Sequence, residues 1–186
     1  MASRIAIYLL GRTFPAIAQS ARMIGKEFDS SVSMRFMDMP LTRSYRKGRS
    51  QYDAEALLLE LSRFASNDAD KTVFLFHEDI FKEPLNFLFG LAYEDAAIVS
   101  TCRLDPRYYS KIEEGELRGA QTLYRERMLK EIMHECGHMF GLDHCKDKRC
   151  AMVFSESVAD VDYKEAHLCA SCRKAIKSVG DKSHYI

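Results

Sequence analysis

Three histidines and one glutamate near residue 140 stand at spacings that suit a metal centre. They lie in the segment H-E-C-G-H-M-F-G-L-D-H, which runs from His134 to His144. On an α-helix, His134 and His138 are roughly 40° apart around the axis and one turn apart along it. Two imidazoles so placed can bind one zinc ion at about 2.0–2.1 Å. Glu135 is rotated by roughly 100° from His134, which suits a general base for zinc-activated water.

Gly141 allows a third histidine to join this pair. The helix must end and the chain must reverse its direction if His144 is to reach the same ion, and glycine adopts the left-handed conformation that ends many helices. Three protein ligands with one open position are typical of catalytic rather than structural zinc. A bare H-E-x-x-H also arises by chance, but Gly141 and His144 at fixed offsets argue against chance here.

Four of the six cysteines form two closely spaced pairs after the histidine segment. Cys145 and Cys150 form C-x4-C, Cys169 and Cys172 form C-x2-C, and 18 residues separate the pairs. Two such pairs are typical of a tetrahedral zinc site with four cysteine ligands. The alternative is two disulfides, which require an oxidising compartment. We expect structural zinc, because a small segment with little core of its own needs such stabilisation.

The elements that must position these residues alternate between strands and helices. Short apolar or alternating runs predict strands at residues 5–10, 32–36, 73–76, 86–92 and 96–101. Longer runs with apolar residues at helical spacing predict helices at residues 16–28, 54–64, 119–140 and 161–178. We expect residues 40–52 to form an exposed loop, and one face of the strand at 32–36, with Val32, Met34 and Phe36, to be buried.

This order predicts an α/β (α+β) fold in which helices pack on a twisted mixed sheet. The length of 186 residues favours a single domain, residues 1–186. Within it we expect an upper lobe of about residues 1–141 and a small lower lobe of about residues 142–186 that carries the four paired cysteines.

Composition and charge exclude several classes of protein. The 27 basic and 27 acidic residues give a formal net charge of zero, so no general attraction to nucleic acid or an anionic membrane is expected. No apolar stretch approaches the roughly 20 residues of a membrane span. The run Ile5–Leu10 is also too short for a secretory signal, which needs about 7–15 apolar residues. We therefore expect a cytoplasmic monomer without a nucleic-acid or membrane partner.

The combined motif resembles the metzincin zinc peptidases, and the archaemetzincins in particular. The histidine motif is followed by C-x4-C-x-M and by C-x2-C, so the resemblance covers His134 to Cys172. The segments Phe89–Ala92 and Ala97–Ser100 also resemble strands of that family. The resemblance implies a metzincin-like zincin fold and a zinc-dependent metallopeptidase with two zinc ions per chain. It also implies peptide or protein substrates and aminopeptidase-like cleavage.

Individual residues match functional positions of that family. Glu135 matches its general base, and Met152 matches a methionine that lies below the metal. Phe154 stands where some metzincins have a tyrosine, so an oxyanion stabiliser must come from elsewhere. The run Asn86–Ala92 is a candidate edge strand for pairing with an extended substrate. The zinc ligands implied by the match are His134, His138 and His144 for the catalytic ion, and Cys145, Cys150, Cys169 and Cys172 for the structural ion.

Two other functions compete with the peptidase. The chain could be a catalytically latent zinc-binding module whose fourth coordination position is blocked. The four-cysteine lobe could instead bind nucleic acid or another protein through the basic residues Lys146, Lys148, Arg149, Arg173, Lys174 and Lys177. Such a basic patch is more often a solvated face, so we favour the peptidase.

Overall fold

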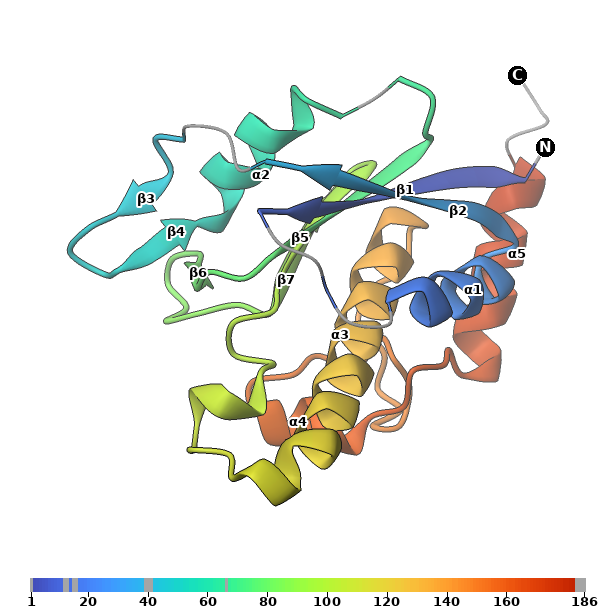
Figure 1. The fold of residues 1–186 in the computed structure, drawn as a ribbon. Coiled ribbons are helices and arrows are strands. Elements are labelled where there is room, and N and C mark those ends of the chain that lie inside the picture. Colours follow the sequence, from blue (N-terminus) through green and yellow to red (C-terminus); the bar gives the residue numbers. More distant parts are fainter. Residues whose placement is uncertain (1, 12–13, 15–16, 39–41, 66, 183–186) are drawn as a thin grey trace.

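A five-stranded sheet forms the centre of the fold (Figure 1). The computed structural model describes residues 2–11, 14, 17–38, 42–65 and 67–182, with side chains up to residue 176. The strand order is β2-β1-β5-β8-β7, and β7 runs antiparallel to β8 whereas the other neighbours are parallel. The predicted mixed sheet is confirmed. Its strands are β1 (Ser3–Leu10), β2 (Ser30–Met37), β5 (Lys71–Phe76), β7 (Gly90–Tyr93) and β8 (Ala96–Ser100).

Helices cover both faces of this sheet. In Figure 1, α2 (Ala54–Ser62) lies on one side, and α1 (Ile17–Glu27) and α3 (Leu117–Met139) lie on the other. Side chains alternate between the two faces of a strand. Accordingly, Ile7 of β1 packs in the core with α1 and α3, whereas its neighbour Tyr8 packs in the core with α2. The predicted helices at residues 16–28, 54–64 and 119–140 are therefore confirmed, with small shifts at their ends.

A second, smaller sheet lies where the sequence predicted a loop at residues 40–52. It joins β3 (Tyr45–Arg46), β4 (Gln51–Asp53) and β6 (Ile80–Phe81) in the order β3-β4-β6. The prediction was wrong because distant residues hold this segment: the Gln51 side chain donates to the Asn86 carbonyl oxygen at 2.9 Å. Residues 40 and 41 of the expected loop lie outside the described residues.

The face of β2 that was expected to be buried is largely exposed. Val32 is half-buried, but Met34 is 41% exposed and Phe36 is 57% exposed. β2 is an edge strand, and Val32 packs against the core that includes α1, whereas the two later residues lie beyond it. Alternation predicted the strand correctly but not how far along it a helix reaches.

The C-terminal helix that was predicted at residues 161–178 is interrupted. The structure has a short α4 (Val158–Tyr163) and a separate α5 (Ala170–Lys182). Lys164 ends α4 with an extended backbone, at ψ 164°, and the chain reaches Cys169 without a helix. This break places the Lys164 side chain against α3, with its Nζ atom 2.8 Å from Glu131. Among the residues described, no helix is long and apolar enough to cross a membrane.

Candidate active site

The end of α3 has the geometry that the histidine motif predicts. Gly141 has a φ of +81°, in the left-handed region that favours glycine. Its N–H donates to the carbonyl oxygen of His138 at 2.9 Å, and the N–H of Leu142 donates to that of Gly137 at 3.0 Å. These two bonds form a Schellman motif, which ends the helix and turns the chain back towards it.

The side chains of the three histidines converge, so that one ring nitrogen of each lies near those of the other two. One ring nitrogen from each of His134, His138 and His144 lies within 4.8 Å of the others. The Nδ1 atoms of His134 and His138 lie 2.8 Å from the carbonyl oxygens of Ala151 and Leu142. A carbonyl oxygen can only accept, so each Nδ1 carries the proton and each Nε2 has a free lone pair. Burial lowers the pKa of all three histidines, which keeps them neutral.

This arrangement fits a metal ion better than a hydrogen-bonded cluster. The Nε2 atoms of His134 and His138 are 3.1 Å apart, yet neither has a proton to share. Zinc bonded at about 2.0–2.1 Å in a tetrahedral site sets its nitrogen ligands roughly 3.3 Å apart. Both carbonyl partners also fix the orientation of their rings, as is usual for histidines that bind metals. The residues present therefore fit a zinc ion.

The chain after Gly141 fixes the position of His144. The N–H of Cys145 donates to the Met152 carbonyl oxygen at 2.9 Å, which fastens this loop to the segment below. The Phe154 ring packs on the His144 ring with centroids 5.0 Å apart. Phe154 carries no hydrogen-bond donor, so its contribution here is packing.

Glu135 is buried between α3 and the edge of the sheet, with only 4% of its surface exposed. A Cβ atom on Gly90 of β7 would lie 2.4 Å from Oε1 of Glu135, so only glycine leaves room for this carboxylate. Burial, with a smaller effect from the Glu131 carboxylate, raises the pKa of Glu135 well above its usual value. Lys164 acts in the opposite direction.

The Met152 side chain packs against α3 at Gly137. It is fully buried, and a Cβ atom on Gly137 would lie 2.1 Å from its Sδ atom. Gly137 therefore allows the Met152 thioether to approach the backbone of the turn that carries His134 and His138. The position of Met152 below the metal stays a prediction.

A cavity of about 700 Å³ opens over these residues. Glu135 and the three histidines line it, as does the β7 edge from Gly90 to Ala92. Of the run Asn86–Ala92 that was predicted as an edge strand, only the part from Gly90 belongs to β7. The site therefore lies between the helix that carries the histidines and an unpaired edge of the sheet.

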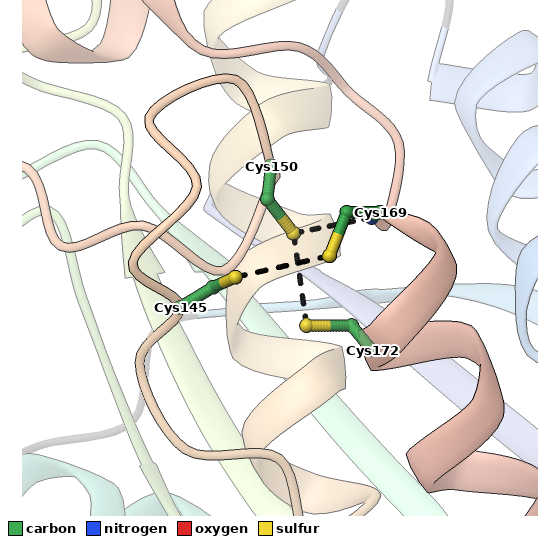
Figure 2. A group of neighbouring side chains, drawn as sticks. All are labelled: Cys145, Cys150, Cys169 and Cys172. Atoms are coloured by element: carbon green, nitrogen blue, oxygen red, sulfur yellow. Dashed lines mark hydrogen bonds between the residues drawn. The ribbon is translucent and has the colours of Figure 1, made fainter.

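The four paired cysteines form a second cluster beside the first (Figure 2). Sγ atoms are 3.8 Å apart between Cys145 and Cys169, and 3.8 Å apart between Cys150 and Cys172. A disulfide would need about 2.05 Å, so the alternative of two disulfides is not what the structure shows. Four thiolates bonded to zinc at about 2.3 Å would lie roughly 3.8 Å apart. The donor set and its spacing therefore fit a zinc ion.

A polar group near the four cysteines stabilises the thiolate form of Cys169. The Ser171 hydroxyl, 2.9 Å from the Cys169 Sγ atom, lowers the pKa of that thiol to about 6. Burial raises the pKa of Cys150 and Cys172. A bound metal ion would have to displace the protons of these two thiols.

Sequence reasoning did not find three residues at the site. Gly90 has no signal other than its residue type, and its role is visible only from the approach of β7 to Glu135. Glu131 lies four residues before Glu135, so helical spacing could have placed both on one face. Lys164 reaches Glu131 through the break after α4, which no local pattern predicted.

Known proteins share this sequence and fold. A profile of Peptidase family M54 matches residues 37–178. The archaemetzincin of Halobacterium salinarum is 39% identical over 141 residues, which are 75% of this chain and 78% of that protein. A crystal structure of the archaemetzincin of Methanopyrus kandleri superposes with a TM-score of 0.80 at 30% identity, covering 97% of this chain and 96% of the other.

A third relative connects the fold with zinc. The zinc-dependent peptidase of Methanocorpusculum labreanum has a TM-score of 0.79 at 25% identity, covering 92% of this chain and 99% of the other. The clusters of three histidines and four cysteines in the present structure provide donors for two zinc ions. The resemblance inferred from the motif is thereby confirmed: the chain belongs to peptidase family M54, the archaemetzincins, and is a zinc-dependent peptidase.

Proposed function

We propose that His134, His138 and His144 hold the catalytic zinc ion of this peptidase and that Glu135 moves the proton during hydrolysis. The observation that carries the proposal is the 3.1 Å separation between the Nε2 atoms of His134 and His138, in the same cavity as the Glu135 carboxylate. Neutral imidazoles whose lone pairs face one another in this way are suited to bind a cation between them.

The proton transfers follow from the position of Glu135. A zinc ion held by the three histidines would polarise the scissile carbonyl and would lower the pKa of water towards about 7. Glu135 takes a proton from the water as its oxygen forms the new bond to the carbonyl carbon. Glu135 then gives this proton to the leaving nitrogen as the C–N bond breaks. Its raised pKa favours holding the proton between the two steps.

The edge of the sheet offers a binding surface for the peptide. Within the part of the chain that the structure describes, β7 pairs with β8 alone, and its residues from Gly90 to Ala92 line the cavity. An extended peptide can add to such an edge through backbone hydrogen bonds. We therefore place the substrate backbone along β7, with the scissile carbonyl opposite the three histidines.

Cleavage close to the N-terminus of the peptide is the finer activity that we propose. Lys164 neutralises Glu131, but Asp143 and Glu156 also line the cavity, against a single lysine, Lys82. This excess of carboxylates favours a cationic α-amino group. The comparison of a peptide that has a free N-terminus with its acetylated form tests this preference. Equal turnover of the two forms would contradict it.

The second proposed zinc site organises the C-terminal segment. Cys145, Cys150, Cys169 and Cys172 would bind this ion, and the first of them directly follows His144. Residues 142–182 contain only α4 and α5 as regular elements, so a metal is a reasonable source of stability there. We propose that the domain consists of an upper lobe of about residues 1–141 and a lower lobe of about residues 142–186.

The remaining expectations concern partners and location. We propose a cytoplasmic monomer that binds neither nucleic acid nor membranes. Two of the basic residues near the cysteines are neutralised, since Arg149 pairs with Glu165 at 2.6 Å and Arg173 pairs with Glu27 at 2.7 Å. Lys177 lies in α5, and its side chain is outside the described ones. Thiolate ligands for zinc also suit a reducing compartment.

The variant Glu135→Gln tests the proposed function. We expect it to keep two zinc ions per chain and to lose peptide turnover by about 10²–10⁴-fold, since a proton carrier of this kind contributes on that order. Glu126→Gln is the matched control, because Glu126 is an exposed glutamate on the same helix. Turnover by Glu135→Gln at the rate of the control would overturn the assignment.

A further inference from the structure

Glu131 forms part of the cavity wall one helical turn before Glu135. It lines the cavity although only 3% of its surface is exposed. One turn of helix is about 5.4 Å long, and successive residues of an extended peptide are roughly 3.3 Å apart. For a peptide that binds with its scissile bond beside Glu135, we therefore expect Glu131 to face a side chain close to that bond rather than the bond itself.

Lys164 neutralises Glu131 from behind the cavity. Its side chain is 1% exposed, and its Nζ atom lies 2.8 Å from the Glu131 Oε1 atom. The two atoms are close enough for an ion pair but poorly aligned, since both lack a hydrogen-bond partner in the described part of the chain. The wall at Glu131 is therefore polar without carrying a net charge, and the Glu131 Oε1 and Lys164 Nζ atoms form no hydrogen bond within the described part of the chain.

Ser155 adds a third buried polar group that forms no hydrogen bond within the described part of the chain. Its hydroxyl oxygen is buried without a hydrogen bond, and Ser155 lines the same cavity as Glu131. Buried polar side-chain atoms in proteins nearly always have a partner. Among the described residues, the only three exceptions are the atoms of Glu131, Lys164 and Ser155. Two of these residues line the active-site cavity, and the third is paired with one of them.

We propose that Glu131, Lys164 and Ser155 form a polar subsite that receives an uncharged amide or hydroxyl side chain of the substrate. Glu131 accepts a hydrogen bond from that side chain, and the Ser155 hydroxyl donates to or accepts from it. A cationic side chain would approach the Lys164 ammonium, and an anionic one would approach the Glu131 carboxylate. An apolar side chain would leave the polar atoms without partners. Peptides with Asn, Gln, Ser or Thr beside the scissile bond are therefore preferred.

This inference rests on the proposed function for the position of the scissile bond, so its test uses binding rather than turnover. Peptide hydroxamates anchor one end of the ligand at a metal and thereby fix the register. We use two series of these hydroxamates, one for each side of the zinc-loaded site along the peptide direction. In each series, the residue next to the hydroxamate group is Gln, Met, Lys or Glu. We expect the zinc-loaded protein to bind the Gln compound of one series at least tenfold more tightly than the Met, Lys and Glu compounds.

Two variants separate the subsite from a merely structural ion pair. Ser155→Ala leaves the pair intact, and we expect the preference for Gln over Met to fall several-fold. The double variant Glu131→Leu/Lys164→Met replaces the pair by apolar side chains, a change that proteins often tolerate. We expect it to reverse the preference, so that the Met compound binds more tightly. Glu126→Gln serves as the control with unchanged preference.

The outcomes are distinguishable. Equal binding of the Gln and Met compounds in both series, or an unchanged preference in Ser155→Ala, overturns the subsite. If the double variant does not fold, Ser155→Ala decides alone. A parallel loss of affinity for all compounds shows a structural role and likewise overturns the proposal. If the protein binds the Gln compounds preferentially but cleaves no peptide, the subsite stands and the proposed mechanism fails.

Discussion

Replacing Gly90 by alanine tests how closely the edge of the sheet positions Glu135. The added Cβ atom would lie 2.4 Å from Oε1 and 2.7 Å from Cγ of Glu135, whereas ordinary contacts begin near 3.4 Å. The carboxylate must therefore move by about 1 Å. A displacement of this size at a reacting group costs about 100-fold in rate, or about 2.7 kcal/mol in the activation free energy. The three atoms nearest to the added Cβ atom all belong to Glu135 and none to a proposed metal ligand, so we expect zinc binding to be unchanged.

The assay measures kcat on a short peptide with zinc-loaded Gly90→Ala, together with zinc content and the unfolding temperature. Gly48→Ala is the control, because nothing lies within 4 Å of the position of its Cβ atom. We expect kcat to fall by about 100-fold in Gly90→Ala alone, with the zinc content equal in both variants. A kcat within twofold of the control, in a folded protein with full zinc content, would refute the argument that this contact positions Glu135.

Further predictions address the second metal site, the ion pairs and the core. Cys150→Ser should lower the zinc content from two ions to one and lower the unfolding temperature, as metal analysis and thermal melts would show; unchanged zinc content would exclude Cys150 as a ligand. The Arg4 side chain and backbone N–H hold the pKa of Asp70 at about 2, below its usual 3.8. Because this pKa is lowered in the folded state, the stabilisation is present above about pH 4 and is lost as the pH falls towards 2; Asp70→Asn should remove that part of the acid sensitivity, and acid titrations identical to those of the wild type would contradict it. Ile98→Ala should cost about 2–5 kcal/mol of unfolding free energy, since Ile98 is fully buried. Phe36→Ala, at a side chain 57% exposed, should cost much less, and urea titrations that give equal losses would show that β2 is covered in solution.

The parts of the site that local geometry determines could be predicted from the sequence. Helical spacing brings His134 and His138 to one face, and Gly141 supplies the left-handed turn that returns His144 to them. The cluster of four cysteines follows in the same way from two short loops and the need for a metal. The mixed sheet was also predicted, because its central strands are short apolar runs between helices.

The parts that depend on distant contacts could not be predicted. Periodicity favoured one helix over residues 161–178, but the chain leaves the helix at Lys164, whose ammonium group pairs with Glu131. The alternation around Phe36 predicts a strand but contains no information about how far α1 extends over it. Gly90 became significant only when the packing of β7 against Glu135 was known.

Zinc-edge anomalous diffraction from crystals of the metal-loaded protein tests the central claim most directly. We expect two zinc peaks per chain, one within bonding distance of His134, His138 and His144 and the other among the four cysteines of Figure 2. The Glu135 carboxylate should lie beside the first peak without being one of its ligands. A first peak that is absent, or that is bound by Glu135 in place of one of the histidines, would contradict the account.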